Sequence, residues 1–190
     1  MKKSLFSAFG AAILALAAVG TANASITVGG VPTITGGPGA YVWTYSSALD
    51  ASESITSGSY FVIYDFAGYV SGSVFAPTGW TASVQLVGPL PAGQGLPDNS
   101  TLENLVFTYT GANATGPIGS LGSFGATSVY GGSSANKNGV FAYTAVNTGL
   151  GSNDEGQGNT ETPTVPEPMT MSLVGGGLAL LGAIRLRRKA

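Results

Sequence analysis

Residues 60–66 read YFVIYDF and form the most apolar stretch outside the two ends of the chain. The first five of these residues are aromatic or β-branched, which is typical of a β-strand. Apolar side chains fall on both alternating faces of the segment, so a strand here would be covered on both sides. The sequence therefore predicts a central strand over residues 60–66, with Asp65 near its end.

Shorter segments of similar texture lie on both sides of this strand, separated by Gly, Pro, Asn and Ser. We predict further strands at residues 26–28, 41–45, 68–75, 80–86, 105–110 and 140–146. Between residues 25 and 147 there is no pattern of an amphipathic helix, so crossovers for a parallel sheet are lacking. The sequence predicts an all-β body, an antiparallel β-sandwich or jelly roll whose two sheets share one apolar layer.

Three other stretches are predicted to be irregular. Residues 48–55 carry two acids and several serines, which favours a loop or a single helical turn. Residues 88–100 contain three prolines and are expected to form a long loop. In residues 116–125 a glycine recurs every third residue, but the triplets are too few and too poor in proline for collagen. An extended Gly-rich loop is the prediction there.

The segment before the C-terminal tail is polar. Residues 147–164 contain one leucine as their only sizeable apolar side chain before the tail. A segment of this composition cannot bury enough apolar surface to fold. We therefore expect a body over residues 25–146 and a flexible polar linker over residues 147–164.

The N-terminus has the three parts of a secretory signal peptide. Lys2 and Lys3 precede an apolar run over residues 5–19, and Ala22 and Ala24 give a small-x-small cleavage site before Ser25. Residues 1–24 are thus expected to form a signal helix that is removed on export.

The C-terminus also has three parts. Val165, Pro166, Glu167 and Pro168 are followed by an uncharged apolar run over residues 169–184 and then by the cations Arg185, Arg187, Arg188 and Lys189. The two prolines keep the motif extended and accessible. As a helix, the run would span about 24 Å, so it needs its basic flank to anchor it in the roughly 30 Å hydrocarbon core. Because cationic flanks stay in the cytoplasm, the body would lie outside.

These residues, VPEP followed by a Gly- and Leu-rich apolar run and RLRRK, resemble the PEP-CTERM sorting signal of Gram-negative bacteria. A closely similar short domain is also named after ice-binding proteins. The resemblance covers residues 165–190 only. It implies that an integral-membrane exosortase recognises the Pro-Glu-Pro motif and removes the single transmembrane helix. It further implies a cell-surface or extracellular location and association with exopolysaccharide in a biofilm matrix.

Charge is unevenly distributed along the chain. Of seven basic residues only Lys137 lies between residues 25 and 164, a range that also holds eight of the nine acidic residues. A surface with one cation cannot neutralise a row of phosphates, which argues against nucleic acid as a partner. The chain has no cysteine and no histidine, which removes Ser-His-Asp and Cys-His catalysis.

Two sets of oxygen-bearing residues are candidate calcium ligands, although neither follows the EF-hand spacing. The first comprises Asp98, Asn99 and Ser100 with Glu103, and the second comprises residues 153–155, which read NDE. Turn formation is the favoured explanation of the same Asp and Asn residues.

The sequence also contains residue types that glycoside hydrolysis and sugar binding require. A glycosidase would need two carboxylates. The candidates are Asp50, Glu53, Asp65, Asp98 and Glu103, none of which lies in a recognisable local signature. Trp43 and Trp80 could stack on sugars if they point outward, or form core if they point inward. The sequence thus favours a non-enzymatic, exported matrix or surface protein without a cofactor. The alternative is a specific carbohydrate-, calcium- or ice-binding module.

Overall fold

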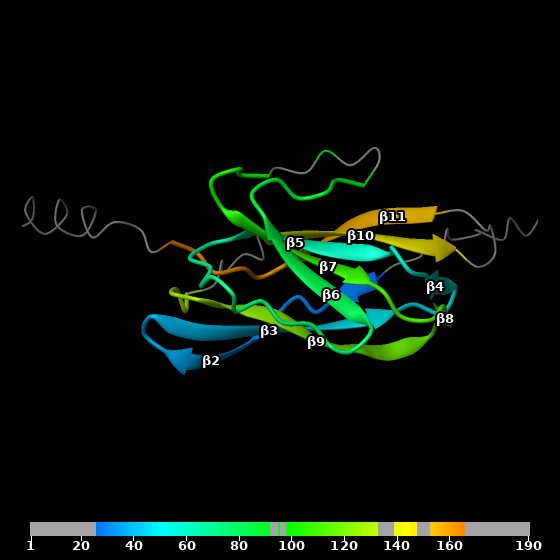
Figure 1. Ribbon diagram of the computed structural model, residues 1–190, viewed down its shortest axis with the longest axis horizontal. Helices are drawn as coiled ribbons and strands as arrows, with labels where there is room; N and C mark the ends of the chain where they lie inside the picture. Colours follow the sequence, from blue (N-terminus) through cyan, green and yellow to red (C-terminus); the bar gives the residue numbers. More distant parts are fainter. Residues whose placement is uncertain (1–25, 92–94, 96–97, 133–138, 148–152, 166–190) are drawn as a thin grey trace, which may run out of the picture.

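The computed structural model describes residues 26–91, 95, 98–132, 139–147 and 153–165. This part of the chain is all-β, with two antiparallel sheets and no helix. Figure 1 shows β2, β3 and β9 in one layer and β5, β10 and β11 in the other. The all-β, antiparallel prediction is confirmed, and the pair of facing sheets is consistent with a β-sandwich.

The first sheet is built around its longest central strand, β3. It contains β1 (Ile26–Val28), β2 (Thr33–Gly37), β3 (Ala40–Leu49) and β9 (Ile118–Ser128). β2 pairs with the first half of β3 and β1 with its end, so the two short strands share one side of it. β9 pairs along the other side of β3.

The second sheet has seven strands, of which β5 and β10 are central. It contains β4 (Glu53–Ile55), β5 (Tyr60–Phe66), β6 (Trp80–Gln85), β7 (Glu103–Tyr109), β8 (Ala114–Thr115), β10 (Gly139–Asn147) and β11 (Asn153–Thr160). Its order runs β6-β7-β5-β10, after which β10 also pairs with β4, and β4 pairs with β8. β11 pairs with the other side of β10.

The two sheets are joined by a cluster of aromatic rings. Phe124 of β9 lies between Phe61, Trp80 and Phe107 of the second sheet, at centroid distances of 4.9, 5.1 and 5.2 Å respectively. All three contacts are edge-to-face, the arrangement that aromatic quadrupoles favour. The predicted apolar layer between two sheets is therefore present, and aromatic residues dominate it.

β5 is buried on both of its faces, as its sequence predicts. Phe61 and Ile63 belong to the layer between the sheets. Val62 and Tyr64 point the other way and form a second, smaller cluster with neighbouring strands. The tyrosine hydroxyl donates a hydrogen bond of 2.6 Å to the carbonyl of Pro89, which lies in the loop after β6. This loop is the second cover that the sequence requires.

The predicted Gly-rich loop at residues 116–125 is wrong, because most of it belongs to β9. Its glycines mark close approaches from the segment that follows β5. Phe75 exchanges two backbone hydrogen bonds with Gly125, and Pro77 packs where a side chain at Gly122 would lie. The return strand expected at residues 68–75 is likewise replaced by two isolated bridges to β9, at Tyr69 and Phe75.

The polar linker expected at residues 147–164 does not hold for the described part of that range. Asn147 ends β10, and Asn153–Thr160 forms β11, which pairs with β10 over eight residues. Apolar content is a poor guide here because this strand is held by backbone hydrogen bonds. The body therefore extends to Val165. Residues 48–55 similarly form the end of β3, a turn and β4 instead of a loop.

The chain beyond β11 crosses to the first sheet and closes the fold. The Thr160 hydroxyl donates to the carbonyl of Gly29 at 2.8 Å, and the Glu161 N–H donates to the carbonyl of Gly30 at 3.1 Å. The buried Tyr45 hydroxyl donates to the Glu161 carbonyl at 3.0 Å. Further along, the Thr164 N–H donates to the carbonyl of Gly132 at 3.0 Å.

Gly125 is predicted to be a packing constraint that Gly119, in the same strand, is not. A Cβ at Gly125 would collide with the backbone carbonyl of Trp43 and lie 2.8 Å from the Phe75 ring, whereas at Gly119 it would meet nothing within 4 Å. We expect Gly125→Ala to lower the free energy of unfolding by about 1–3 kcal/mol. Gly119→Ala should stay within about 0.5 kcal/mol of wild type. Urea titration of both variants measures the difference, and equal stabilities would contradict it.

Candidate functional site

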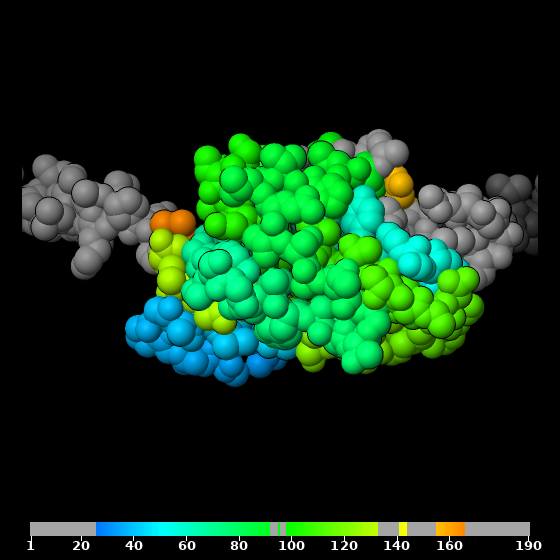
Figure 2. Space-filling model, in the orientation of Figure 1, coloured from blue at the N-terminus to red at the C-terminus, as the bar shows by residue number. Residues whose placement is uncertain are grey.

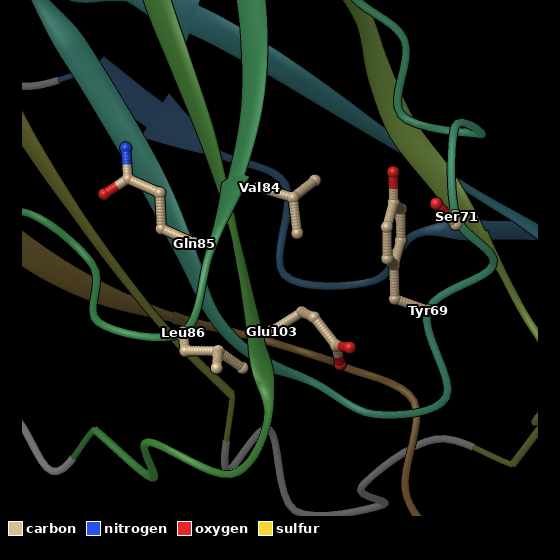
Figure 3. Close-up of a pocket in the computed structure, with 6 residues that line it drawn as sticks. All are labelled: Tyr69, Ser71, Val84, Gln85, Leu86 and Glu103. Atoms are coloured by element: carbon tan, nitrogen blue, oxygen red, sulfur yellow. The ribbon is translucent and has the colours of Figure 1, made fainter.

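A groove opens where β6 ends and β7 begins, beside the segment that carries Tyr69 and Ser71. It has a volume of about 330 Å³ and is lined by Tyr69, Ser71, Val84, Gln85, Leu86 and Glu103. Figure 3 shows these side chains: Val84 and Gln85 leave opposite sides of β6, and the Glu103 carboxylate is directed towards Tyr69. Figure 2 shows β6 and the loop after it, in green, at the centre of the visible face.

Strand alternation explains which side chains reach the groove. Val84 pairs with Leu105, and both belong to or pack on the core between the sheets. Glu103 is two residues before Leu105 in β7, so it points to the same side, beyond the edge of the apolar layer. Tyr69 packs against the core from the segment that bridges to β9. The groove is thus the open margin of the apolar layer.

A β-bulge in β5 sets the position of Glu103. Ile63 pairs with Leu105 and Phe66 pairs with Glu103, so Tyr64 and Asp65 together oppose the single residue Asn104. Within the bulge, Asp65 has a φ of 55°, a left-handed conformation that Asp tolerates better than most residues.

Asn104 is fully buried and holds three segments together. Its Oδ1 accepts a hydrogen bond of 2.9 Å from the N–H of Asp65, which fixes the bulge. Its Nδ2 donates to the carbonyl of Leu86 at 3.3 Å and to Asp98 Oδ1 at 3.0 Å. The amide therefore ties the bulge in β5 to the end of β6 and to the loop that covers the outer face.

The loop itself is closed by carboxylates that accept backbone hydrogen bonds. Asp98 Oδ2 accepts from the N–H of Gly88 at 3.1 Å, and Asp65 Oδ1 accepts from the N–H of Asn99 at 2.9 Å. Burial raises the pKa of Asp65, the bond from Asn99 lowers it, and the negative charge of Asp98 raises it again. Burial also raises the pKa of the Tyr64 hydroxyl, and electrostatic repulsion from Tyr60 and Asp98 raises this pKa further.

The first predicted calcium set does not converge in the structure. Asp98 and Asn99 lie in the network around Asn104, and Asn99 Oδ1 accepts from both the N–H and the hydroxyl of Thr101. Glu103 precedes Asn104 in the strand and points to the opposite face. In the second set, residues 153–155 begin β11. Within the described ranges no group of three or more acidic side chains is placed to hold a metal ion.

Both tryptophans are core residues and provide no sugar-stacking surface. Trp43 is completely buried, and its Nε1 donates to the carbonyl of Tyr130 at 3.0 Å. Trp80 is 8 % exposed and stacks edge-on against Phe61 and Tyr109. The aromatic side chain at the groove is Tyr69, which the sequence reasoning did not single out.

The predicted processing residues lie almost entirely outside the described residues. Val165 is described and is 56 % exposed. The remaining members are Ala22, Ala24, Ser25, Pro166, Glu167, Pro168, Arg185, Arg187, Arg188 and Lys189. Over the residues that the structure does describe, no helix has the length and apolarity needed to cross a membrane.

Comparison of the chain with protein-family models, curated proteins and solved structures finds no match. The groove and the two chain ends must therefore be interpreted from their own chemistry.

Asp65→Asn is expected to remove a pH-dependent loss of folding stability that the ionised Asp65 carboxylate causes. Because the folded pKa of Asp65 lies above its ordinary value of 3.8, the folded state holds this proton more tightly than the unfolded state. Stability from this group is complete below that ordinary value and is lost as pH rises through the folded pKa. Asn104 and Asn99 can still bond to an asparagine there.

The free energy of unfolding of Asp65→Asn should therefore exceed that of wild type at neutral pH, with the gap closing towards pH 3. Urea titrations at several pH values measure this gap. A variant that is less stable than wild type at neutral pH would contradict the expectation.

Proposed function

We propose that this chain is an exported, non-enzymatic surface or matrix protein that an exosortase sorts and that associates with exopolysaccharide. An N-terminal signal helix would direct export of its β-sandwich, jelly-roll-like body. A single C-terminal transmembrane helix would then hold the body outside the inner membrane. Removal of that helix then frees the body at the cell surface.

The observation that carries this proposal is the order of three features at the C-terminus: Val165–Pro168, the apolar run over residues 169–184 and the four terminal cations. An ordinary anchor needs the run and the cations but has no use for a glutamate between two prolines. The described fold reaches Val165, where the motif begins, and the preceding residue, Thr164, is hydrogen-bonded to Gly132.

Two features of the described residues support a role without catalysis. The groove is lined by one carboxylate, Glu103, whereas hydrolysis of a glycosidic bond ordinarily uses two. The described ranges contain no Lys or Arg, which leaves no cation there to stabilise a developing negative charge. The same lack of cations disfavours nucleic acid as a partner.

Glu167→Ala tests the sorting step. We expect this variant to be exported normally but to stay in the membrane fraction with its tail. The reason is that the motif which the exosortase recognises has lost its charged residue. Wild-type protein from the medium should lack residues 169–190 by intact mass. Glu161→Ala is the matched control, since it removes a carboxylate six residues away and outside the motif. Equal release of Glu167→Ala and wild type would refute the processing step.

A flexible insertion tests the position of the motif at the edge of the fold. Ten Gly and Ser residues between Thr164 and Val165 would move the body away by roughly 17 Å on average. Because the folded body then no longer crowds the motif, tail removal should become faster in a pulse-chase experiment. Adding Glu167→Ala to the same insertion should stop it. An unchanged rate would mean that the body does not limit access to the motif.

A further inference from the structure

The groove is an electrostatically one-sided site. The Glu103 carboxylate is directed into it, and among the described residues no hydrogen bond or ion pair engages that carboxylate. No lysine or arginine occurs in the described ranges. A ligand with a positive group would gain a charge-assisted hydrogen bond here, whereas a phosphate or a uronic acid would be repelled.

The groove also has apolar side chains beside that charge. Val84 forms part of its floor against the core, and Leu86, 54 % exposed, continues the lining along the same edge. The Tyr69 ring stands across from them. Its hydroxyl accepts a hydrogen bond of 3.1 Å from the N–H of Gly72, which holds the ring in place. A tyrosine ring attracts a cation in addition to packing against apolar surface.

The size and rim of the groove narrow the class of ligand. A volume of about 330 Å³ lies at the low end of the roughly 300–1,000 Å³ that ligand pockets span, which suits a compact unit. The hydroxyl of Ser71 lies on the Tyr69 side and can bond to hydroxyl groups of a ligand. A sugar ring has one apolar face and several hydroxyls, which matches this combination.

We propose that the groove binds a saccharide bearing a free amino group, with the ammonium at Glu103 and the ring between Tyr69 and Val84. This inference deepens the proposed function and rests on it for the source of the sugar, a cationic matrix polysaccharide. A basic peptide would satisfy Glu103 and Tyr69 but would leave Ser71 unused and the groove incompletely filled.

Calorimetric titration of the full chain in a zwitterionic, sugar-free detergent tests the proposal. The probes are glucosamine oligomers, their N-acetylated counterparts, glucuronic acid oligomers and oligolysine. We expect the glucosamine oligomers to bind, and acetylation, which removes the charge, to weaken binding roughly ten-fold or more. Glu103→Gln should abolish this preference, and Tyr69→Ala should weaken both neutral and cationic sugars.

Glu155→Gln is the matched control, because it removes one negative charge from β11, and it should bind like wild type. Urea titration of each variant establishes that the fold is retained. No binding of glucosamine oligomers, a preference unaffected by Glu103→Gln, or equal binding of oligolysine would overturn the proposal. Because these measurements use purified protein, they can fail while tail removal in cells succeeds, so the two proposals are separable.

Discussion

The insertion of Phe124 among Phe61, Trp80 and Phe107 is the interaction on which the rest of the structure depends. These rings bring the first sheet against the second, and each ring is buried. With no cysteine in the chain, the sheets cannot be joined by disulfides, so noncovalent contacts such as these hold them together. The groove exists because this layer ends before the strands do, which leaves Val84 and Glu103 at an open margin.

Asn104 is the second constraint, and it acts on the groove from the opposite face of β7. A fully buried amide costs free energy unless its hydrogen-bonding groups are satisfied, and here both its oxygen and its nitrogen are engaged. Its bonds fix the bulge that sets the register between Phe66 and Glu103. They also hold Leu86, so two groove residues are positioned by one side chain that never enters the groove.

The sequence predicts the strands that carry their own apolar signal and misses those that depend on distant partners. Tyr60–Phe66 was predicted with its observed bounds, because each of its faces is apolar by itself. β11 has no apolar face and therefore no such signal. It is a strand because its backbone pairs with β10, which its own sequence does not reveal. In β9 the glycines that indicate a loop are there because Phe75 and Pro77 approach from another segment.

The site could be predicted only in fragments for the same reason. The sequence identifies Glu103 as a candidate ligand because it is acidic, but its orientation depends on a bulge in another strand. Tyr69 lies in a segment whose path is set by bridges to β9, so its place opposite Glu103 has no local sequence signal.

Neutral hydrogen bonds join several distant segments of this body, whereas recognition at the groove is electrostatic. Because the described ranges contain no Lys, Arg or His, no side-chain ion pair forms between two of the described residues. Distant segments are joined instead by neutral bonds to carbonyls, such as those from Trp43 to Tyr130, from Tyr45 to Glu161 and from Ser128 to Ala67. Such bonds are little screened by salt, whereas attraction of a cation to Glu103 is. Ionic strength should therefore act more strongly on what the groove binds than on these neutral connections.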